Sequence, residues 1–271
     1  MSALDACRLP VDGGDALFCE VTGNGPPLVL THDAFLHRES WDGQFVSLSG
    51  SYRIVRWDRR GYGQSDEPRA PYASDQDLAR VIAELTEPPA ILMGCSNGGL
   101  LSLLCALRYP ELVAALVLVG PIVSGLSFTG HLTSRGGRRP SGDLTVAEEI
   151  EYWSSTDPWF IARANTGARE RLRALLTANP NNLSPKDHLE RAFESPALPL
   201  LGQIAVPTLI IAGEEDIADV HAHCGAIEAA IPGARRLILP GSGHLPHFEV
   251  PGEFNTAVLG FLIRLHQSDG G

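Results

Sequence analysis

The feature that most constrains the fold of this chain is an apolar run, residues 90–95, that ends in a Gly-x-Ser-x-Gly pattern. The pattern consists of Gly94, Ser96 and Gly98, and a helix-like segment follows over residues 100–109. At such a strand–turn–helix junction the serine sits on a strained turn with its hydroxyl clear of the sheet. The two glycines lack the side chains that would collide where strand and helix approach each other. The stretch predicts a nucleophile elbow at Ser96, although a plain strand-to-helix loop also satisfies the pattern taken alone.

Strands and helices alternate on both sides of this junction. Two alternating stretches around an Asp-Gly-Gly-Asp turn predict an N-terminal hairpin over residues 7–21. The continuous apolar run 113–119 is typical of a central parallel strand that is covered on both faces. Further strands are expected at the other short apolar runs, residues 28–31, 53–57, 207–212 and 235–239. The alternation predicts an α/β protein with a mostly parallel central sheet flanked by helices.

The alternation stops in the middle of the chain. Residues 125–142 are rich in Gly, Ser and Arg and are expected to loop over the surface. Helices are expected at residues 145–153, 168–177 and 184–193. We therefore predict a core domain with a helical cap, or lid, inserted over the carboxyl ends of the strands. The core comprises residues 1–120 and 203–271, and the cap comprises residues 121–202.

Composition limits the partners that this chain can have. The formal net charge is −11, which argues against binding to a nucleic-acid backbone or an anionic membrane surface. No apolar run approaches the length of a membrane span, and the N-terminus lacks the pattern of a signal peptide. The five cysteines are widely spaced, so we expect reduced thiols in a cytoplasmic protein. A disulfide between Cys7 and Cys19 across the hairpin is the less favoured alternative.

A catalytic triad is predicted from residues that follow strands. A serine hydroxyl is a poor nucleophile until a neighbouring base takes its proton, and that base needs a third group to orient it. Asp216 and His244 each stand in a short loop directly after a predicted strand. The order Ser, Asp, His is the one expected for a triad on such a sheet. We predict Ser96 as the nucleophile, His244 as the general base and acid, and Asp216 as its orienting partner.

Other residues compete for these roles. Glu214, Glu215 and Asp219 lie close to Asp216 in the chain, and the spacing from the strand end favours Asp216 over them. Cys95 precedes the elbow serine, but the elbow geometry selects the central residue as the nucleophile.

Two histidines and a cysteine of one predicted helix are of the residue types that bind metal ions. They are His221, His223 and Cys224. Residues two apart on a helix point in different directions, so we predict no metal site there. We also expect no cofactor.

Four motifs together resemble the α/β-hydrolase superfamily, and the resemblance covers nearly the whole chain outside residues 121–203. The motifs are His32 with Trp41; Asp58-x-Arg60-Gly61-x-Gly63-x-Ser65; the elbow; and Gly243-His244 followed by Pro246, Glu249 and Pro251. The resemblance implies the fold of that superfamily and the triad predicted above. It also implies an oxyanion hole formed by the backbone N–H groups of Ala34 and Asn97. Asp33 departs from the pattern, because the superfamily usually has glycine there.

Aspartate tolerates unusual backbone angles, so the loop that contains Asp33 is compatible with this residue. Its charge would nevertheless oppose an oxyanion unless the side chain points away or is paired.

A serine at the elbow indicates acyl transfer, whereas relatives that cleave epoxides or carbon–halogen bonds carry aspartate there. We predict hydrolysis of a small to medium apolar carboxylic ester or lactone through an acyl-enzyme. Residues expected to bind the substrate are Phe35, Trp153, Trp159, Phe160 and Leu245. Three alternatives remain open: hydrolysis of a carbon–carbon bond in a diketone, cofactor-free peroxide chemistry with organic acids, and a receptor that binds its ligand without turnover. The sequence leaves the oligomeric state open.

Overall fold

The computed structural model describes residues 4–135, 140, 142–184, 189–191 and 193–268 of the 271-residue chain. Within these residues one eight-stranded sheet has the strand order β1-β2-β4-β3-β5-β6-β7-β8. The strands are β1 (Asp5–Pro10), β2 (Ala16–Thr22), β3 (Pro27–Thr31), β4 (Arg53–Trp57), β5 (Ala90–Cys95), β6 (Val113–Val119), β7 (Thr208–Gly213) and β8 (Arg235–Leu239). All neighbouring strands from β4 to β8 pair in parallel, whereas β2 pairs antiparallel with β1 and β4. The predicted mostly parallel sheet is confirmed.

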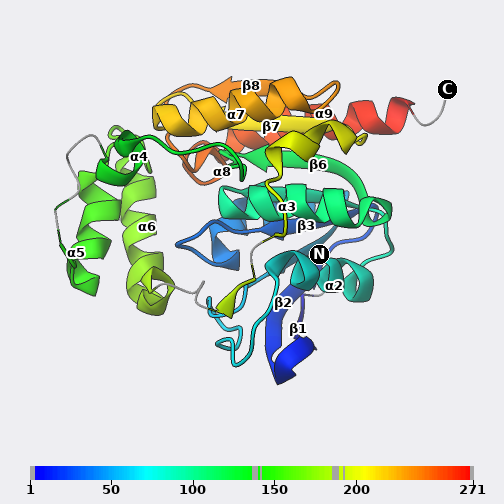
Figure 1. Ribbon diagram of the computed structural model, residues 1–271, viewed down its shortest axis with the longest axis horizontal. Helices are drawn as coiled ribbons and strands as arrows, with labels where there is room; N and C mark the ends of the chain where they lie inside the picture. The colour runs from blue at the N-terminus through cyan, green and yellow to red at the C-terminus, as the bar shows by residue number, and fades with distance from the viewer. Residues whose placement is uncertain (1–3, 136–139, 141, 185–188, 192, 269–271) are drawn as a thin grey trace.

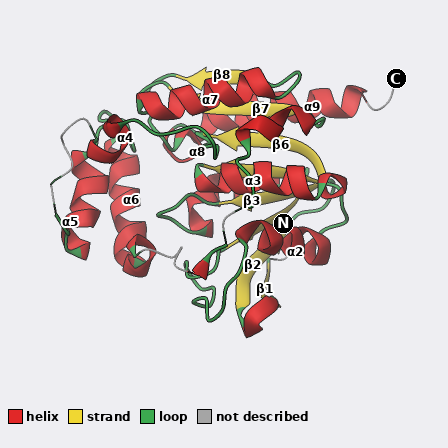
Figure 2. Cartoon of the chain, in the orientation of Figure 1, coloured by secondary structure: helices red, strands yellow, loops and turns green. Residues whose placement is uncertain are grey.

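Helices cover both faces of the sheet, as the red ribbons on either side of the yellow strands indicate in Figure 2. One face packs against α2 (Ser74–Leu85), α3 (Asn97–Arg108) and α7 (Ala218–Ala230). The other face packs against α1 (Asp42–Leu48), α8 (Pro246–Glu249) and α9 (Pro251–Ser268). Every residue of β5 and of β7 is buried as a result. These two strands read as continuous apolar runs because water reaches neither face.

We call residues 121–202, between β6 and β7, the cap segment. Its central helices form a separate group, whereas its last turn, the 3-10 helix Leu198–Gln203, packs against α3 and α7 of the core. The central helices are α4 (Gly130–Ser134), α5 (Val146–Glu151) and α6 (Thr166–Ala178). Figure 1 shows these helices together at one end of the sheet, the end toward which β6 and β8 run. These three helices therefore lie at the carboxyl ends of the parallel strands, where ligands bind in folds of this type.

Local sequence explains where one cap helix begins. Thr145 accepts a hydrogen bond from the N–H of Glu148, and the Glu148 carboxylate accepts one in return from the N–H of Thr145. This reciprocal pair is a capping box, which satisfies two backbone donors at the start of α5.

Two predictions for the cap segment need correction. The stretch 125–142 is not all loop, because α4 lies within it. The helix expected over 184–193 falls partly on residues 185–188 and 192, which lie outside the described residues. Glu190, which is described, forms an isolated bridge with Tyr72 and does not belong to a helix.

The N-terminal hairpin is confirmed, with β1 and β2 antiparallel and Cys7 opposite Cys19. All five cysteines have free thiols. None of the helices in the described part of the chain combines the length and the apolar character needed to cross a bilayer.

Candidate active site

The turn between β5 and α3 holds Ser96 in a strained conformation. The backbone angles of Ser96 are φ 53° and ψ −113°, and a positive φ is uncommon outside glycine. A Cβ atom on Gly94 would lie 2.1 Å from the carbonyl oxygen of Gly98, and one on Gly98 would lie 2.3 Å from that of Thr31. Because backbone atoms occupy these places, only glycine fits at positions 94 and 98, two residues before and after the serine. This is the geometry of a nucleophile elbow.

The loops after β7 and β8 bring an acid and a histidine together. His244 Nδ1 lies 2.7 Å from Asp216 Oδ2, and both side chains are buried. The two loops touch closely, since a Cβ atom on Gly213 would lie 1.9 Å from the carbonyl oxygen of Gly243. Asp219, the alternative acid, instead accepts hydrogen bonds from the N–H and hydroxyl of Thr129.

The electrostatics around His244 favour a charged imidazole. Burial lowers the pKa of His244, but the charge of Asp216 and, after it, the charge of Asp33 raise it by more. The pKa of His244 is therefore raised from its usual value. A base that must accept a proton during a reaction near neutral pH benefits from this shift.

The cap segment contacts the backbone of the loop that carries His244. The N–H of His244 donates to the carbonyl oxygens of Trp159 at 2.8 Å and Phe160 at 3.1 Å. Nearby, the buried Glu249 accepts hydrogen bonds from the N–H of Gly243 at 2.8 Å and of Ala162 at 2.7 Å. The position of the histidine thus depends on the cap segment as well as on the sheet.

The loop after β3 holds the side chain of Asp33 in an internal turn. Asp33 Oδ1 accepts hydrogen bonds from the N–H groups of Phe35 at 2.7 Å and Leu36 at 3.1 Å. Asp33 Oδ2 is buried without a partner among the described residues. Burial raises the pKa of Asp33, and the two backbone donors and His244 oppose that shift. Asp33 does not have a positive φ, so this position does not need the freedom of glycine.

His32 supports the same loop from behind. Its Nε2 accepts a hydrogen bond of 3.0 Å from the N–H of Arg59, and its Nδ1 lies 2.8 Å from the carbonyl oxygen of Asp33. Burial lowers the pKa of His32 well below its usual value, which keeps the ring neutral. A neutral ring with its proton on Nδ1 satisfies both bonds.

A pocket of about 260 Å³ contains both Ser96 and His244, together with Ala34 of the loop after β3. Its remaining lining residues are Asp33, Phe35, Ile122, Phe128, Leu132, Arg135, Trp153, Phe160, Ile217 and Val220. The Phe35 ring lies 4.6 Å from that of Trp153 and 5.7 Å from that of Phe160, measured between centroids. The structure thus brings together the elbow serine, the histidine and three of the aromatic residues named from sequence.

Two residues named from sequence as substrate contacts lie elsewhere. Leu245 is fully buried in the hydrophobic core, and Trp159 does not line the pocket. The ring of Trp159 packs edge-on against His131, and its carbonyl oxygen accepts a hydrogen bond from the N–H of His244. Sequence reasoning missed Arg135, which does line the pocket. It stands in a Gly- and Arg-rich stretch without periodicity, so no pattern distinguished it.

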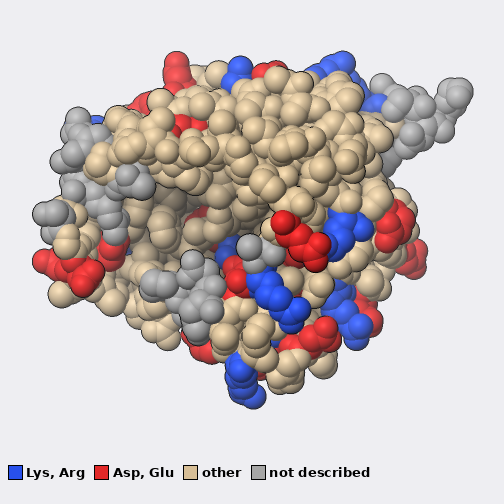
Figure 3. Space-filling view, in the orientation of Figure 1, with Lys and Arg blue, Asp and Glu red and all other residues tan. Residues whose placement is uncertain are grey.

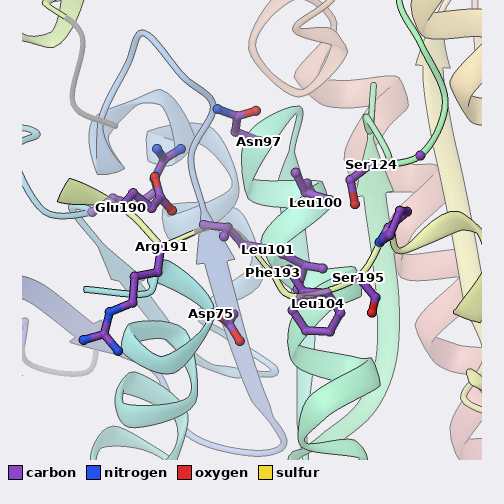
Figure 4. Close-up of a pocket in the computed structure, with 13 residues that line it drawn as sticks. Asp75, Asn97, Leu100, Leu101, Leu104, Ser124, Glu190, Arg191, Phe193 and Ser195 are labelled. Carbon is purple, nitrogen blue, oxygen red and sulfur yellow. The ribbon is translucent and has the colours of Figure 1, made fainter. Parts of the chain in front are cut away.

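A second, larger pocket of about 520 Å³ lies beside the first and shares no lining residue with it. Figure 4 shows Leu100, Leu101 and Leu104 on α3, with Asn97 at the start of the same helix. Glu190, Arg191 and Phe193 contribute from the segment that leads back to β7. Asn97 is the first residue of α3, where backbone N–H groups lack partners within the helix. Its side chain lines the second pocket while its backbone adjoins Ser96.

His223, one of the three α7 residues considered as metal ligands, makes other contacts. His223 Nδ1 accepts a hydrogen bond from the N–H of Val123, and its ring stacks on Phe128 at 4.5 Å. Across the described residues no group of three or more His, Cys, Asp or Glu side chains is arranged to hold a metal ion. The face of the molecule in Figure 3 carries acidic and basic side chains next to one another and no extended basic patch.

Comparison with known proteins defines the class. The alpha/beta hydrolase fold family matches residues 26–251 of this chain. The chain therefore belongs to the α/β-hydrolase fold family, which confirms the resemblance found in its motifs.

Its relatives carry the names of several hydrolases. The chain is 27% identical over 248 residues to pimeloyl-[acyl-carrier protein] methyl ester esterase of Nitrosomonas europaea, covering 88% of this chain and 96% of that protein. A hydrolase from Pseudomonas aeruginosa PA01 is 29% identical with a TM-score of 0.76, covering 95% of this chain and 98% of that one. An enol-lactonase from Burkholderia xenovorans LB400 has a TM-score of 0.76 at 23% identity, covering 95% of this chain and 100% of that one, which shows a shared fold alone.

Proposed function

We propose that this protein is a serine hydrolase that cleaves a small to medium carboxylic ester or lactone through an acyl-enzyme on Ser96. The observation that carries the proposal is the buried hydrogen bond of 2.7 Å between Asp216 and His244, together with the pocket that His244 shares with the strained elbow serine. That constellation matches the roles of a catalytic triad. The name of the Nitrosomonas europaea relative, a methyl ester esterase, supports an ester as the substrate.

In the acylation step His244 Nε2 takes the proton from Ser96 Oγ while Oγ bonds to the carbonyl carbon. The carbonyl oxygen becomes an oxyanion and accepts hydrogen bonds from the N–H groups of Ala34 and Asn97. Loss of one such donor typically costs about 100- to 1,000-fold in rate. The imidazolium then gives its proton to the departing alcohol oxygen as the ester bond breaks. Asp216 accepts the Nδ1 hydrogen throughout, so the correct tautomer faces the serine.

Deacylation repeats the sequence with water. His244 removes a proton from a water molecule, whose oxygen attacks the acyl carbon, and Ser96 Oγ leaves with the proton returned to it. The lining of the pocket is mostly aromatic and aliphatic, and its volume of about 260 Å³ favours a compact acyl group. We propose the cap segment as a lid that shapes this pocket, above a core of residues 1–120 and 203–271.

The test is the initial rate of hydrolysis of p-nitrophenyl esters from acetyl to dodecanoyl. Turnover that disappears in Ser96→Ala supports the proposal, and the preferred chain length measures the acyl pocket. Cys95→Ala is the matched control, because Cys95 is the neighbouring nucleophile and is fully buried outside the pocket. Full activity in Ser96→Ala would overturn the assignment. Failure on every ester would redirect the search to lactones, to diketones and peroxide chemistry, and then to a receptor that retains its ligand without turnover.

A further inference from the structure

Arg135 places a positive charge in the pocket that contains Ser96 and His244. It stands at the carboxyl end of α4 in the cap segment. Its φ is 49°, and it and Ser96 are the two non-glycine residues with positive φ in the described part of the chain. Such a position after a helix is usually glycine or asparagine. Backbone strain at a bulkier residue persists where the surroundings hold it, and it clusters at ligand sites.

The surroundings of Arg135 fix its guanidinium group. Its Nε and Nη2 atoms lie 2.7 Å from the two carboxylate oxygens of Asp157, and both side chains are buried. The rings of Trp153 and Trp159 each have their centroid 5.4 Å from the guanidinium carbon. The hydroxyl of Tyr152 also lies within hydrogen-bonding reach of the guanidinium group, and among the described residues no further partner accompanies these contacts at Nη1. The donor is therefore held in place, and its hydrogens remain available.

The carboxylate of Asp157 accepts hydrogen bonds from several donors besides Arg135. Its Oδ1 also accepts hydrogen bonds from the N–H groups of Trp159 at 3.0 Å and Phe160 at 2.7 Å. Its Oδ2 accepts one of 3.2 Å from the hydroxyl of Tyr152. The carboxylate thus organises the wall of the pocket and orients the arginine, while the charge of the arginine still acts on the pocket.

Apart from Asp157, no carboxylate of a described residue lies at hydrogen-bond distance from Arg135. Its neighbours in the lining are mostly apolar. The carboxyl group of Asp33 also lines the pocket: Oδ1 accepts from two backbone N–H groups, Oδ2 has no partner among the described residues, and burial raises the pKa of the group, which weakens its repulsion of an anion. In such surroundings an arginine donor binds an anionic acceptor more strongly than a neutral one, because charge-assisted hydrogen bonds are the stronger kind.

We propose that Arg135 binds a carboxylate at the far end of the acyl group, so that the favoured substrates are monoesters of short dicarboxylic acids. This specificity rests on the proposed ester hydrolysis by Ser96. The ester end lies at Ser96 and the carboxylate end lies at Nη1 of Arg135. The small volume of the pocket restricts the chain between them to a few carbons.

The kinetic test compares monomethyl glutarate with methyl 5-oxohexanoate, its neutral isostere, by methanol release. We expect the wild type to favour the anionic ester by kcat/KM, and Arg135→Gln to lose roughly 10- to 100-fold of that preference, mainly through KM. Arg135→Lys keeps the charge and is expected to retain part of the preference. Arg135→Gly also removes the side chain. Because glycine adopts the positive φ of this position without strain, this second variant is expected to fold even if Arg135→Gln does not. The rate with the neutral ester is the internal control in each variant, because it shows whether the residues around Ser96 still work.

A binding test separates this proposal from the hydrolysis on which it rests. Trp153 and Trp159 flank the guanidinium, so saturable changes in tryptophan fluorescence report glutarate binding without turnover. We expect wild-type protein to bind glutarate and Arg135→Gln to bind it roughly 10-fold more weakly. Ser96-dependent hydrolysis with equal preference in wild type, Arg135→Gln and Arg135→Gly would overturn the proposal and leave the hydrolase standing. Arg135-dependent glutarate binding without hydrolysis of any ester or lactone would overturn the hydrolase and retain the anion site.

Discussion

Glu249 Oε2 accepts a hydrogen bond of 2.7 Å from the N–H of Ala162, and its other oxygen accepts one of 2.8 Å from the N–H of Gly243, next to His244. One buried carboxylate therefore joins the cap segment to His244. Burial raises the pKa of Glu249 from 4.5 to about 7, although the N–H groups of Ala162 and Gly243 oppose the shift. The hydrogen bonds of Glu249, which join the cap segment to the loop that carries His244, are thus sensitive to pH near neutrality.

Glu249 should make the stability of the protein fall as pH rises from about 4.5 to about 7. In that window the folded protein binds a proton that the unfolded chain has released, so raising the pH favours unfolding. The contribution is up to about 3 kcal/mol and levels off above the folded pKa. Urea unfolding of wild type and Glu249→Gln across this range measures it. The difference between the two proteins should slope in the window, and parallel curves would contradict the prediction.

The acid limb of the pH–rate profile should move to lower pH in Asp33→Asn. The charges of Asp216 and Asp33 raise the pKa of His244 against burial, with Arg135 acting in the opposite direction. Because the neutral imidazole is the active base, kcat/KM falls as pH drops through this raised pKa. Asparagine keeps the oxygen that accepts from Phe35 and Leu36, so the loop should retain its shape. An unmoved acid limb would show that Asp33 carries no charge near the histidine.

Replacing the orienting acid should separate the two aspartates near the end of β7. Asp216→Asn is expected to lower kcat by about 10,000-fold, because the amide favours the wrong imidazole tautomer. Asp219→Asn weakens the contacts with Thr129 and removes a charge that acts on His223, and it should leave kcat within a few-fold of wild type. Steady-state kinetics on the best ester decides between them. A large loss in Asp219→Asn with a small one in Asp216→Asn would reverse the assignment.

The fold and the pairing of His244 with Asp216 were accessible from the sequence because their signals are local. Gly94 and Gly98 are required by backbone contacts that any elbow makes, and the acid and histidine each follow a strand whose apolar run is visible. Parallel strands then bring those loop residues to the same edge of the sheet. The proximity of Asp216 and His244 therefore follows from the parallel arrangement of β7 and β8.

The lining of the pocket could not be predicted in the same way. Trp159 and Leu245 were chosen for their chemistry and their neighbours in sequence, yet one serves His244 through its backbone and the other fills the core. Arg135 lies in a stretch without periodicity, and its place depends on a buried partner 22 positions away, Asp157. Asp33 was recognised as unusual. Its hydrogen bonds to the N–H groups of Phe35 and Leu36 are local, but its burial beside His244 depends on the tertiary structure.

The bonds from the His244 N–H to the carbonyls of Trp159 and Phe160 also bear on engineering by exchange of segments. A cap segment transplanted from another family member would bring its own binding surface, but it would also have to supply a carbonyl oxygen at that place. Without one, the backbone N–H of His244 would be buried and unpaired, at a cost of about 1–3 kcal/mol. The segment around Trp159 and the histidine loop are therefore one module, and a chimaera should take both from the same parent.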